Sequence, residues 1–312
     1  MLPFVAMTLL LGCETEPPAA GAQQSSASAK GAQSSKATRL CLELQSPQER
    51  VQLGEPLSLV ASLINCSSEP QQVDDLLSPE FGFLQVFIQA PDGKELLHRP
   101  ITKRDARGKR TQSLGPGERL SALAPVYASA EGWTIASPGR YRFRAQYAVE
   151  ATRVDSKPID VTVTPPESDA DRQAANIIMS REVGWFLIAG RDEKSEGSKR
   201  LAALVKQYPQ SRLAPYARVG LAVADSRERF DSSTKTFRQA GCERAVDELA
   251  RAVPEVADLS LAATGTASWI RCLRQLGRDK EVAAAADTFR RSHPAAKDVP
   301  AVNQLLGVTR QE

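Results

Sequence analysis

The chain has 312 residues, enough for two domains of ordinary size. Its 40 basic and 37 acidic residues leave a formal charge of only +3, which excludes a strongly basic nucleic-acid-binding protein. No apolar run approaches the roughly 20 residues that a membrane-spanning helix needs.

The N-terminus contains an apolar run over residues 2–11, which is followed directly by Gly12 and Cys13. Its length fits the roughly 7 to 15 apolar residues of a signal peptide. The run resembles a bacterial lipoprotein signal peptide, with 10–13 as the lipobox, which implies a signal peptide over 1–12 and lipid on Cys13. No Lys or Arg precedes the run, so an upstream start or an ordinary apolar N-terminus is the alternative.

Residues 13–38 are rich in Ala, Ser, Gln, Gly and Pro, and contain no apolar residue larger than Ala after the lipid site. Such a segment cannot bury enough surface to offset its ordering entropy, so we expect a disordered linker. It would either tether folded domains to a membrane or serve as a tail without that role. The resemblance implies a lipid-anchored protein of the bacterial cell envelope that faces the periplasm or the exterior.

The next segment, 39–165, has the pattern of short strands. Apolar residues alternate with polar ones, and Gly and Pro mark turns such as 54–56, 115–117 and 137–139. Strands are expected at 39–44, 57–63, 83–89, 120–127, 141–149 and 159–163. Several short strands without a helical pattern favour an all-β sandwich.

Two stretches in this segment resemble bacterial immunoglobulin-like domains. Residues 53–57, followed by a strand that ends in 64–67, are similar to strand B of such domains, and 138–145 is similar to a late strand entered through a Pro-Gly turn. The order of elements also resembles a small bacterial proteinase-inhibitor fold of the immunoglobulin type. Such a resemblance supports the fold more than any function.

Four cysteines remain when Cys13 is set aside, two in each expected domain. Cys41 and Cys66 each lie opposite the Leu-rich face of their strand, so both are expected to point away from the core. Two interpretations are then open: a disulfide between neighbouring strands, or two unpaired thiols. An oxidising compartment permits the disulfide.

One dense basic run occurs between strands, and its cationic residues are Lys103, Arg104, Arg107, Lys109 and Arg110. It is a candidate for contact with anionic headgroups or an acidic polymer. The alternative is a solvated loop. No aromatic residue is interleaved to stack on bases, so nucleic acid is not an expected partner.

From residue 168 the apolar spacing becomes helical, and 168–312 is expected to be an all-α domain. Ser168 with Asp171 is a capping pair. The expected helix faces centre on 174–188, 201–208, 213–221, 246–253, 262–276 and 282–289, with a last pair at Leu305 and Leu306.

This helical segment also contains an internal repeat. A large apolar residue precedes a proline by five positions at Pro209, Pro254 and Pro294. Residues 207–222 and 275–281 resemble tetratricopeptide-like repeats of bacterial envelope proteins. The period departs from the usual 34 residues, and Ile270 stands where that family has a small residue. The fold class is therefore multidomain α+β: an immunoglobulin-like sandwich followed by degenerate helical hairpins.

Cys242 and Cys272 lie equally far from residue 257, inside the turn expected between two helices. In an antiparallel hairpin such positions lie side by side, because both helices rise about 1.5 Å per residue. This predicts a second disulfide, with two buried thiols as the alternative.

The sequence contains none of the common catalytic signatures. Only His98 and His293 occur, zinc spacings are missing, and there is no Walker loop, nucleophile elbow or dinucleotide fingerprint. We expect no enzyme, cofactor or metal. The function expected is an anchored scaffold that binds an envelope protein through its helices. The alternative is an inhibitor or accessory subunit that acts through the sandwich loops.

Overall fold

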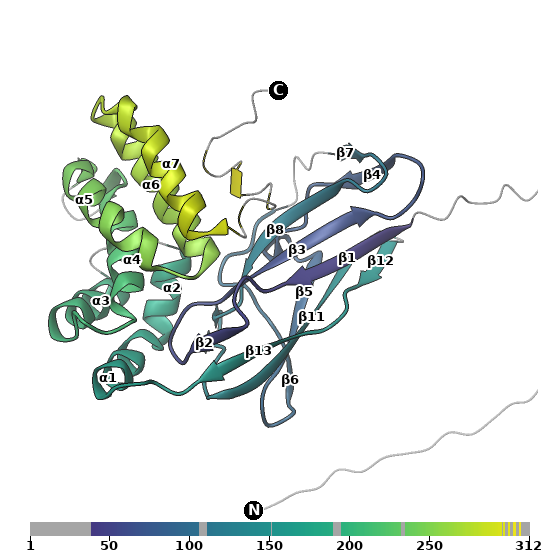
Figure 1. Ribbon diagram of the computed structural model, residues 1–312, viewed down its shortest axis with the longest axis horizontal. Helices are drawn as coiled ribbons and strands as arrows, with labels where there is room; N and C mark the ends of the chain where they lie inside the picture. The colour runs from purple at the N-terminus through teal and green to yellow at the C-terminus, as the bar shows by residue number, and fades with distance from the viewer. Residues whose placement is uncertain are drawn as a thin grey trace, which may run out of the picture. The chain divides into compact units, whose positions relative to one another are not determined.

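A computed structural model gives the arrangement of the chain (Figure 1). It describes residues 39–105, 111–150, 152–189, 195–231 and 235–294, together with 296, 299, 302–303 and 306. The expected signal peptide, the lipid site Cys13 and the linker lie outside these residues, as do Leu305 and the basic residues Arg107, Lys109 and Arg110.

The N-terminal part is built from strands. The six expected from alternation are present: β1 (Leu40–Gln45), β3 (Ser58–Asn65), β5 (Leu84–Gln89), β8 (Arg119–Pro125), β11 (Gly139–Val149) and β13 (Ile159–Thr164). Shorter strands join them: β2 (Arg50–Gln52), β4 (Gln71–Asp74), β6 (Glu95–Leu97), β7 (Thr111–Leu114), β9 (Ala128–Ser129), β10 (Gly132–Trp133) and β12 (Thr152–Asp155). The short strands were not expected, because two to four residues are too few to show a period.

Two sheets form the sandwich. One has the order β1-β3-β8, and the other has the order β2-β13-β11-β5-β6 with β12 added beside β11. Only β2 and β13 pair in parallel, within the strands just named. Alternate residues of both sheets fill one core, in which Leu59, Val86 and Phe143 are wholly buried. The N-terminal part is therefore the β-rich layer structure that its period of two predicts.

The C-terminal part contains seven helices within the described residues: α1 (Asp169–Ile178), α2 (Arg181–Ala189), α3 (Glu196–Gln207), α4 (Ala214–Asp225), α5 (Cys242–Ala252), α6 (Leu259–Gln275) and α7 (Val282–Ser292). The single face expected over 174–188 is divided between α1 and α2. A hairpin of β14 (Arg229–Asp231) and β15 (Thr236–Arg238) between α4 and α5 was not expected.

Local signals in the sequence place the helix ends. Ser168 Oγ accepts a hydrogen bond from the Asp171 amide at 3.0 Å and begins α1, as the capping pair predicts. Asp258 Oδ1 accepts from the Leu261 amide at 2.8 Å and begins α6. Pro209 and Pro294 each follow the last residue of a helix within two positions, because proline cannot continue the hydrogen-bond ladder.

Strand β3 is buried on both faces, which its alternation did not predict. Its odd positions face the sandwich core, whereas Val60 belongs to the same apolar cluster as the helices, together with Tyr127 and Ala128. Gly54 has a φ of +95°, and a Cβ there would lie 3.0 Å from Leu213 Cδ1 of the helical part. Sheet and helices thus share packing, and contacts group residue 38 onward into one compact unit. Independent folding of 39–165 and 168–312 stays a prediction.

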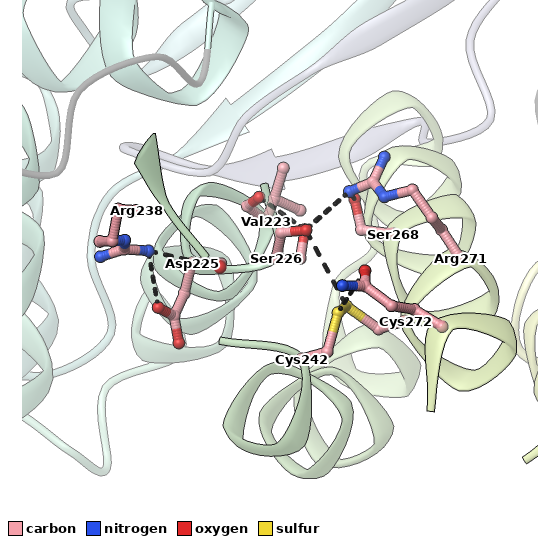
Figure 2. Close-up of a disulfide and its surroundings, with 9 residues drawn as sticks. Val223, Asp225, Ser226, Arg238, Cys242, Ser268, Arg271 and Cys272 are labelled. Atoms are coloured by element: carbon pink, nitrogen blue, oxygen red, sulfur yellow. Dashed lines mark hydrogen bonds and ion pairs between the residues drawn. A yellow bond between two sulfur atoms is a disulfide. The ribbon is translucent and has the colours of Figure 1, made fainter. Parts of the chain in front are cut away.

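The structure places both expected cysteine pairs at disulfide distance. Cys41 and Cys66 have Cα atoms 5.9 Å apart, because β1 and β3 pair antiparallel and residue 66 follows directly after β3. Cys242 of α5 and Cys272 of α6 have Cα atoms 5.0 Å apart (Figure 2). Disulfides persist in oxidising compartments, so the pairs suggest an extracytoplasmic protein. Within the described ranges, none of the helices has the length and apolarity required to cross a bilayer.

Candidate functional site

A cleft lies where strand β2 meets the helices, and we call it the junction cleft. It has a volume of about 750 Å³ and is bounded by the segment around β2, the α3–α4 turn and the end of α5. Its charged lining consists of Arg50, Arg212, Arg218, Arg251, Glu55 and Glu255. These side chains carry a formal excess of two positive charges, which favours an anionic ligand.

The α3–α4 turn is held in place by Asp171. Its Oδ1 accepts from Ser211 Oγ at 2.8 Å and from the Arg212 amide at 2.9 Å. Burial raises the pKa of Asp171, but hydrogen bonds from Ser168, Ser211 and Arg212 outweigh burial and hold the pKa below its usual value. The ionised carboxylate therefore fixes the backbone that carries Arg212 at the edge of the cleft.

Glu55 lies in the wall of the cleft with only 6% of its side chain exposed. Its Oε2 accepts from the Gln52 amide at 2.8 Å, and its Oε1 lies 3.5 Å from the Arg212 guanidinium. Burial raises the pKa of Glu55, although the Gln52 amide and Arg212 oppose the change. Its carboxylate is thus held by the Gln52 amide and Arg212, and it offsets part of the positive charge of Arg212.

A second depression adjoins the cleft, and we call it the α4–α5 groove. It has a volume of about 550 Å³ and shares Arg218 and Arg251 with the cleft. The Glu248 carboxylate forms ion pairs with both arginines, at 2.6 Å from the Arg251 guanidinium and 3.9 Å from that of Arg218. Apolar side chains line the floor between the charged groups, among them Val205 and Leu221. The groove therefore offers apolar contact next to cationic positions.

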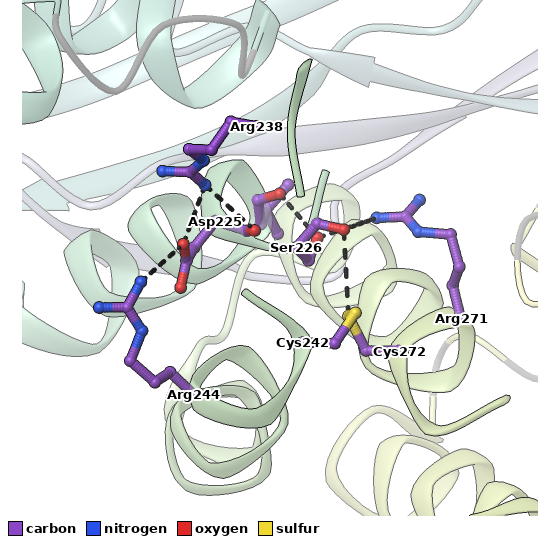
Figure 3. A network of polar contacts seen from close by, with 8 residues as sticks. Asp225, Ser226, Arg238, Cys242, Arg244, Arg271 and Cys272 are labelled. Carbon is purple, nitrogen blue, oxygen red and sulfur yellow. Dashed lines mark hydrogen bonds and ion pairs between the residues drawn. A yellow bond between two sulfur atoms is a disulfide. The ribbon is translucent and has the colours of Figure 1, made fainter. Parts of the chain in front are cut away.

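The far end of the groove repeats this sharing of one carboxylate by two arginines (Figure 3). Asp225 Oδ1 lies 3.0 Å from Arg238 and 3.1 Å from Arg244. The Gly241 amide donates to the Asp225 carbonyl at 2.9 Å, and a Cβ at 241 would lie 2.6 Å from both carboxylate oxygens. A side chain at 241 would therefore have to displace the Asp225 carboxylate from this position.

Behind Asp225, Ser226 and the second disulfide connect the helices that form the end of the groove. Ser226 Oγ donates to the Val223 carbonyl at 2.7 Å and accepts from Arg271 of α6 at 2.8 Å (Figure 2). Burial lowers the pKa of Arg271. Since the disulfide joins α5 to α6 at the same level, three helices are fixed relative to one another at the end of the groove.

Of the basic run singled out in the sequence, the structure describes Lys103 and Arg104, and neither lines either depression. Arg104 pairs with Glu80, and its amide also donates to the Glu80 carbonyl at 2.9 Å. Neither Lys103 nor Arg104 lines the junction cleft. The arginines that do line it were not predicted, because they come from positions spread between 50 and 251 and only the fold gathers them.

His98, which was expected in a loop, is almost fully buried. Its Nδ1 has no hydrogen-bond partner within the part of the chain that the structure describes. Burial lowers the pKa of His98 to about 4, although the Pro125 carbonyl opposes this change. His98 lines a separate cavity of about 460 Å³ beside β8 and α6. The described residues contain no group of three or more His, Cys, Asp or Glu side chains that could hold a metal ion.

Comparison with known proteins gives only distant similarity. No family model and no curated protein matches the chain. Among solved structures, a CARDB domain from Pyrococcus furiosus, solved in complex with di-metal ions, is 18% identical with a TM-score of 0.22, and the match covers 40% of this chain and 88% of that one.

Two further matches are similarly distant. A β-glucosidase from Erythrobacter marinus is 15% identical with a TM-score of 0.25, over 41% of this chain and 16% of that one. The sporulation control protein Spo0M from Bacillus subtilis is 12% identical with a TM-score of 0.24, over 45% of this chain and 54% of that one. Similarity of this degree carries no information on function.

Proposed function

We propose that this protein is a non-catalytic, lipid-anchored protein of the bacterial cell envelope that binds a partner protein through its helical part. In this proposal Cys13 carries the lipid, residues 14–38 form the tether, and the immunoglobulin-like sandwich supports tetratricopeptide-like helices. The two disulfides support a location outside the cytoplasm.

One observation carries the binding role: the junction cleft and the α4–α5 groove meet at Arg218 and Arg251 and form a continuous lined surface across α3, α4 and α5. Arginine is enriched where proteins bind one another, since it combines charge, planar hydrogen bonding and apolar contact. The wall of this surface is held by Asp171, Ser226 and a disulfide, so little ordering entropy opposes binding.

Site-specific photo-crosslinking in native membranes tests this function with the full chain. A photoreactive residue at Leu221, inside the groove, should yield one defined crosslinked species. The matched control position is Lys157, which is exposed between β12 and β13 and lines neither depression. It should yield none.

A third position addresses the inhibitor or accessory-subunit alternative. Asp92 lies in an exposed turn of the sandwich. Crosslinks from Asp92 alone would refute the helical binding role and favour the loops of the sandwich. Absence of crosslinks from all positions would refute both roles.

A further inference from the structure

We propose that the junction cleft binds an extended acidic peptide segment of the partner protein. This inference rests on the proposed protein-binding function and names the chemistry of the partner. Its basis is the charge of the lining, the incomplete neutralisation of the arginines and the length of the surface.

Three of the four cleft arginines, Arg50, Arg218 and Arg251, have only one carboxylate partner between them among the described residues. Arg50 is exposed on β2 and makes no ion pair with any residue of the described ranges. Arg218 and Arg251 share the single carboxylate of Glu248. A ligand carboxylate can therefore bind guanidinium groups without first displacing an internal partner from each of them.

Arg212 connects these positions. Its side chain is about half exposed, and it pairs with Glu167 at 3.0 Å across the surface while Glu55 lies behind it at 3.5 Å. Glu167 is itself 65% exposed, so its pairing with Arg212 is screened by solvent and contributes little. A ligand carboxylate can therefore replace Glu167 beside Arg212 at little cost, while Glu55 stays in place behind it.

The dimensions favour a peptide over a single small anion. The cleft of about 750 Å³ adjoins the groove of about 550 Å³, and the cationic side chains recur along both. The floor between them includes Val205 and Leu221. An extended chain presents side chains alternately to opposite sides, so acidic residues can meet the arginines while apolar neighbours meet this floor.

Fluorescence anisotropy with the purified full chain tests the inference. The probe is a labelled short peptide of alternating Glu and Leu, and the comparison peptide has Lys in place of Glu. The Glu peptide should bind, with an affinity that falls as salt is raised, and the Lys peptide should not. Arg50→Gln and Arg212→Gln should each weaken binding by about three- to tenfold.

Arg153→Gln is the matched control, because Arg153 is exposed on β12 and lines neither depression. Its affinity should equal that of the unaltered chain, and an unchanged thermal midpoint should show that all three variants fold. Equal binding of the Glu and Lys peptides, or unchanged affinity in both cleft variants, would overturn the inference.

Two competitors define the ligand class. Free glutamate that displaces the probe as effectively as unlabelled Glu peptide would show a small-anion site instead. An oligonucleotide that competes as well as the peptide would show a general polyanion surface. If Leu221 still crosslinks a partner while the Glu peptide fails to bind, the protein-binding function stands and the acidic-peptide inference fails.

Discussion

Replacing His98 with glutamine should remove a loss of stability that the native protein suffers in mild acid. The imidazole is almost fully buried, and its pKa in the folded protein is about 4, against 6.5 for an unperturbed histidine. The unfolded chain therefore binds more protons than the folded chain between these two pH values. Stability must fall as the pH falls through this window.

The magnitude follows from the two pKa values. A difference between 6.5 and about 4 corresponds to about 3 kcal/mol once the pH lies below both values. At pH 5 the same relation gives a loss of about 2 kcal/mol relative to pH 7. His98→Gln does not titrate, and its amide can still donate to the Pro125 carbonyl, so this part of the pH dependence should disappear.

Urea unfolding of both proteins at pH 7 and pH 5 measures the effect. The difference in unfolding free energy between the two pH values should be about 2 kcal/mol smaller in His98→Gln than in the unaltered chain. Other groups that titrate in this range are common to both proteins and cancel in the comparison. Identical pH dependence in both proteins would refute the argument that the buried imidazole stays neutral.

Three further outcomes are expected. Cys242→Ser combined with Cys272→Ser should lower the unfolding free energy by about 3 to 4 kcal/mol, because the disulfide closes a loop with a sequence separation of 30 residues. An unchanged urea unfolding curve in the double variant would contradict this prediction. Burial raises the pKa of Asp258, so the unfolding free energy should fall as the pH rises above about 3.9. Asp258→Asn should remove this fall, because its amide oxygen does not titrate and can still accept from the Leu261 amide. Equal dependence of the unfolding free energy on pH in both proteins would contradict this prediction. Cys13→Ala should move the protein from the membrane fraction to the soluble fraction, and unchanged partitioning would exclude the anchor.

Local periodicity decided much of the fold. A period of two predicted the long strands. The helical period predicted six helical segments that correspond to the seven observed helices, with the division between α1 and α2 missed. The midpoint argument placed Cys242 beside Cys272, because an antiparallel hairpin has a fixed rise and therefore a calculable register. Classification of the helices as tetratricopeptide-like stays a prediction, since helix packing angles depend on side chains that meet only in the folded chain.

The sequence by itself determined the elements and their order, because these depend on neighbours along the chain. Tertiary structure decided which faces are covered and which charges meet. The alternation of β3 did not predict that its second face is buried. Val60 on that face packs with helices that lie 100 residues or more along the chain, and no local pattern records such a partner. For the same reason, neither Arg50 nor Arg251 could be recognised from the sequence as part of a binding site. They line one cleft only because β2 and the end of α5 are brought together by packing between the sheet and the helices.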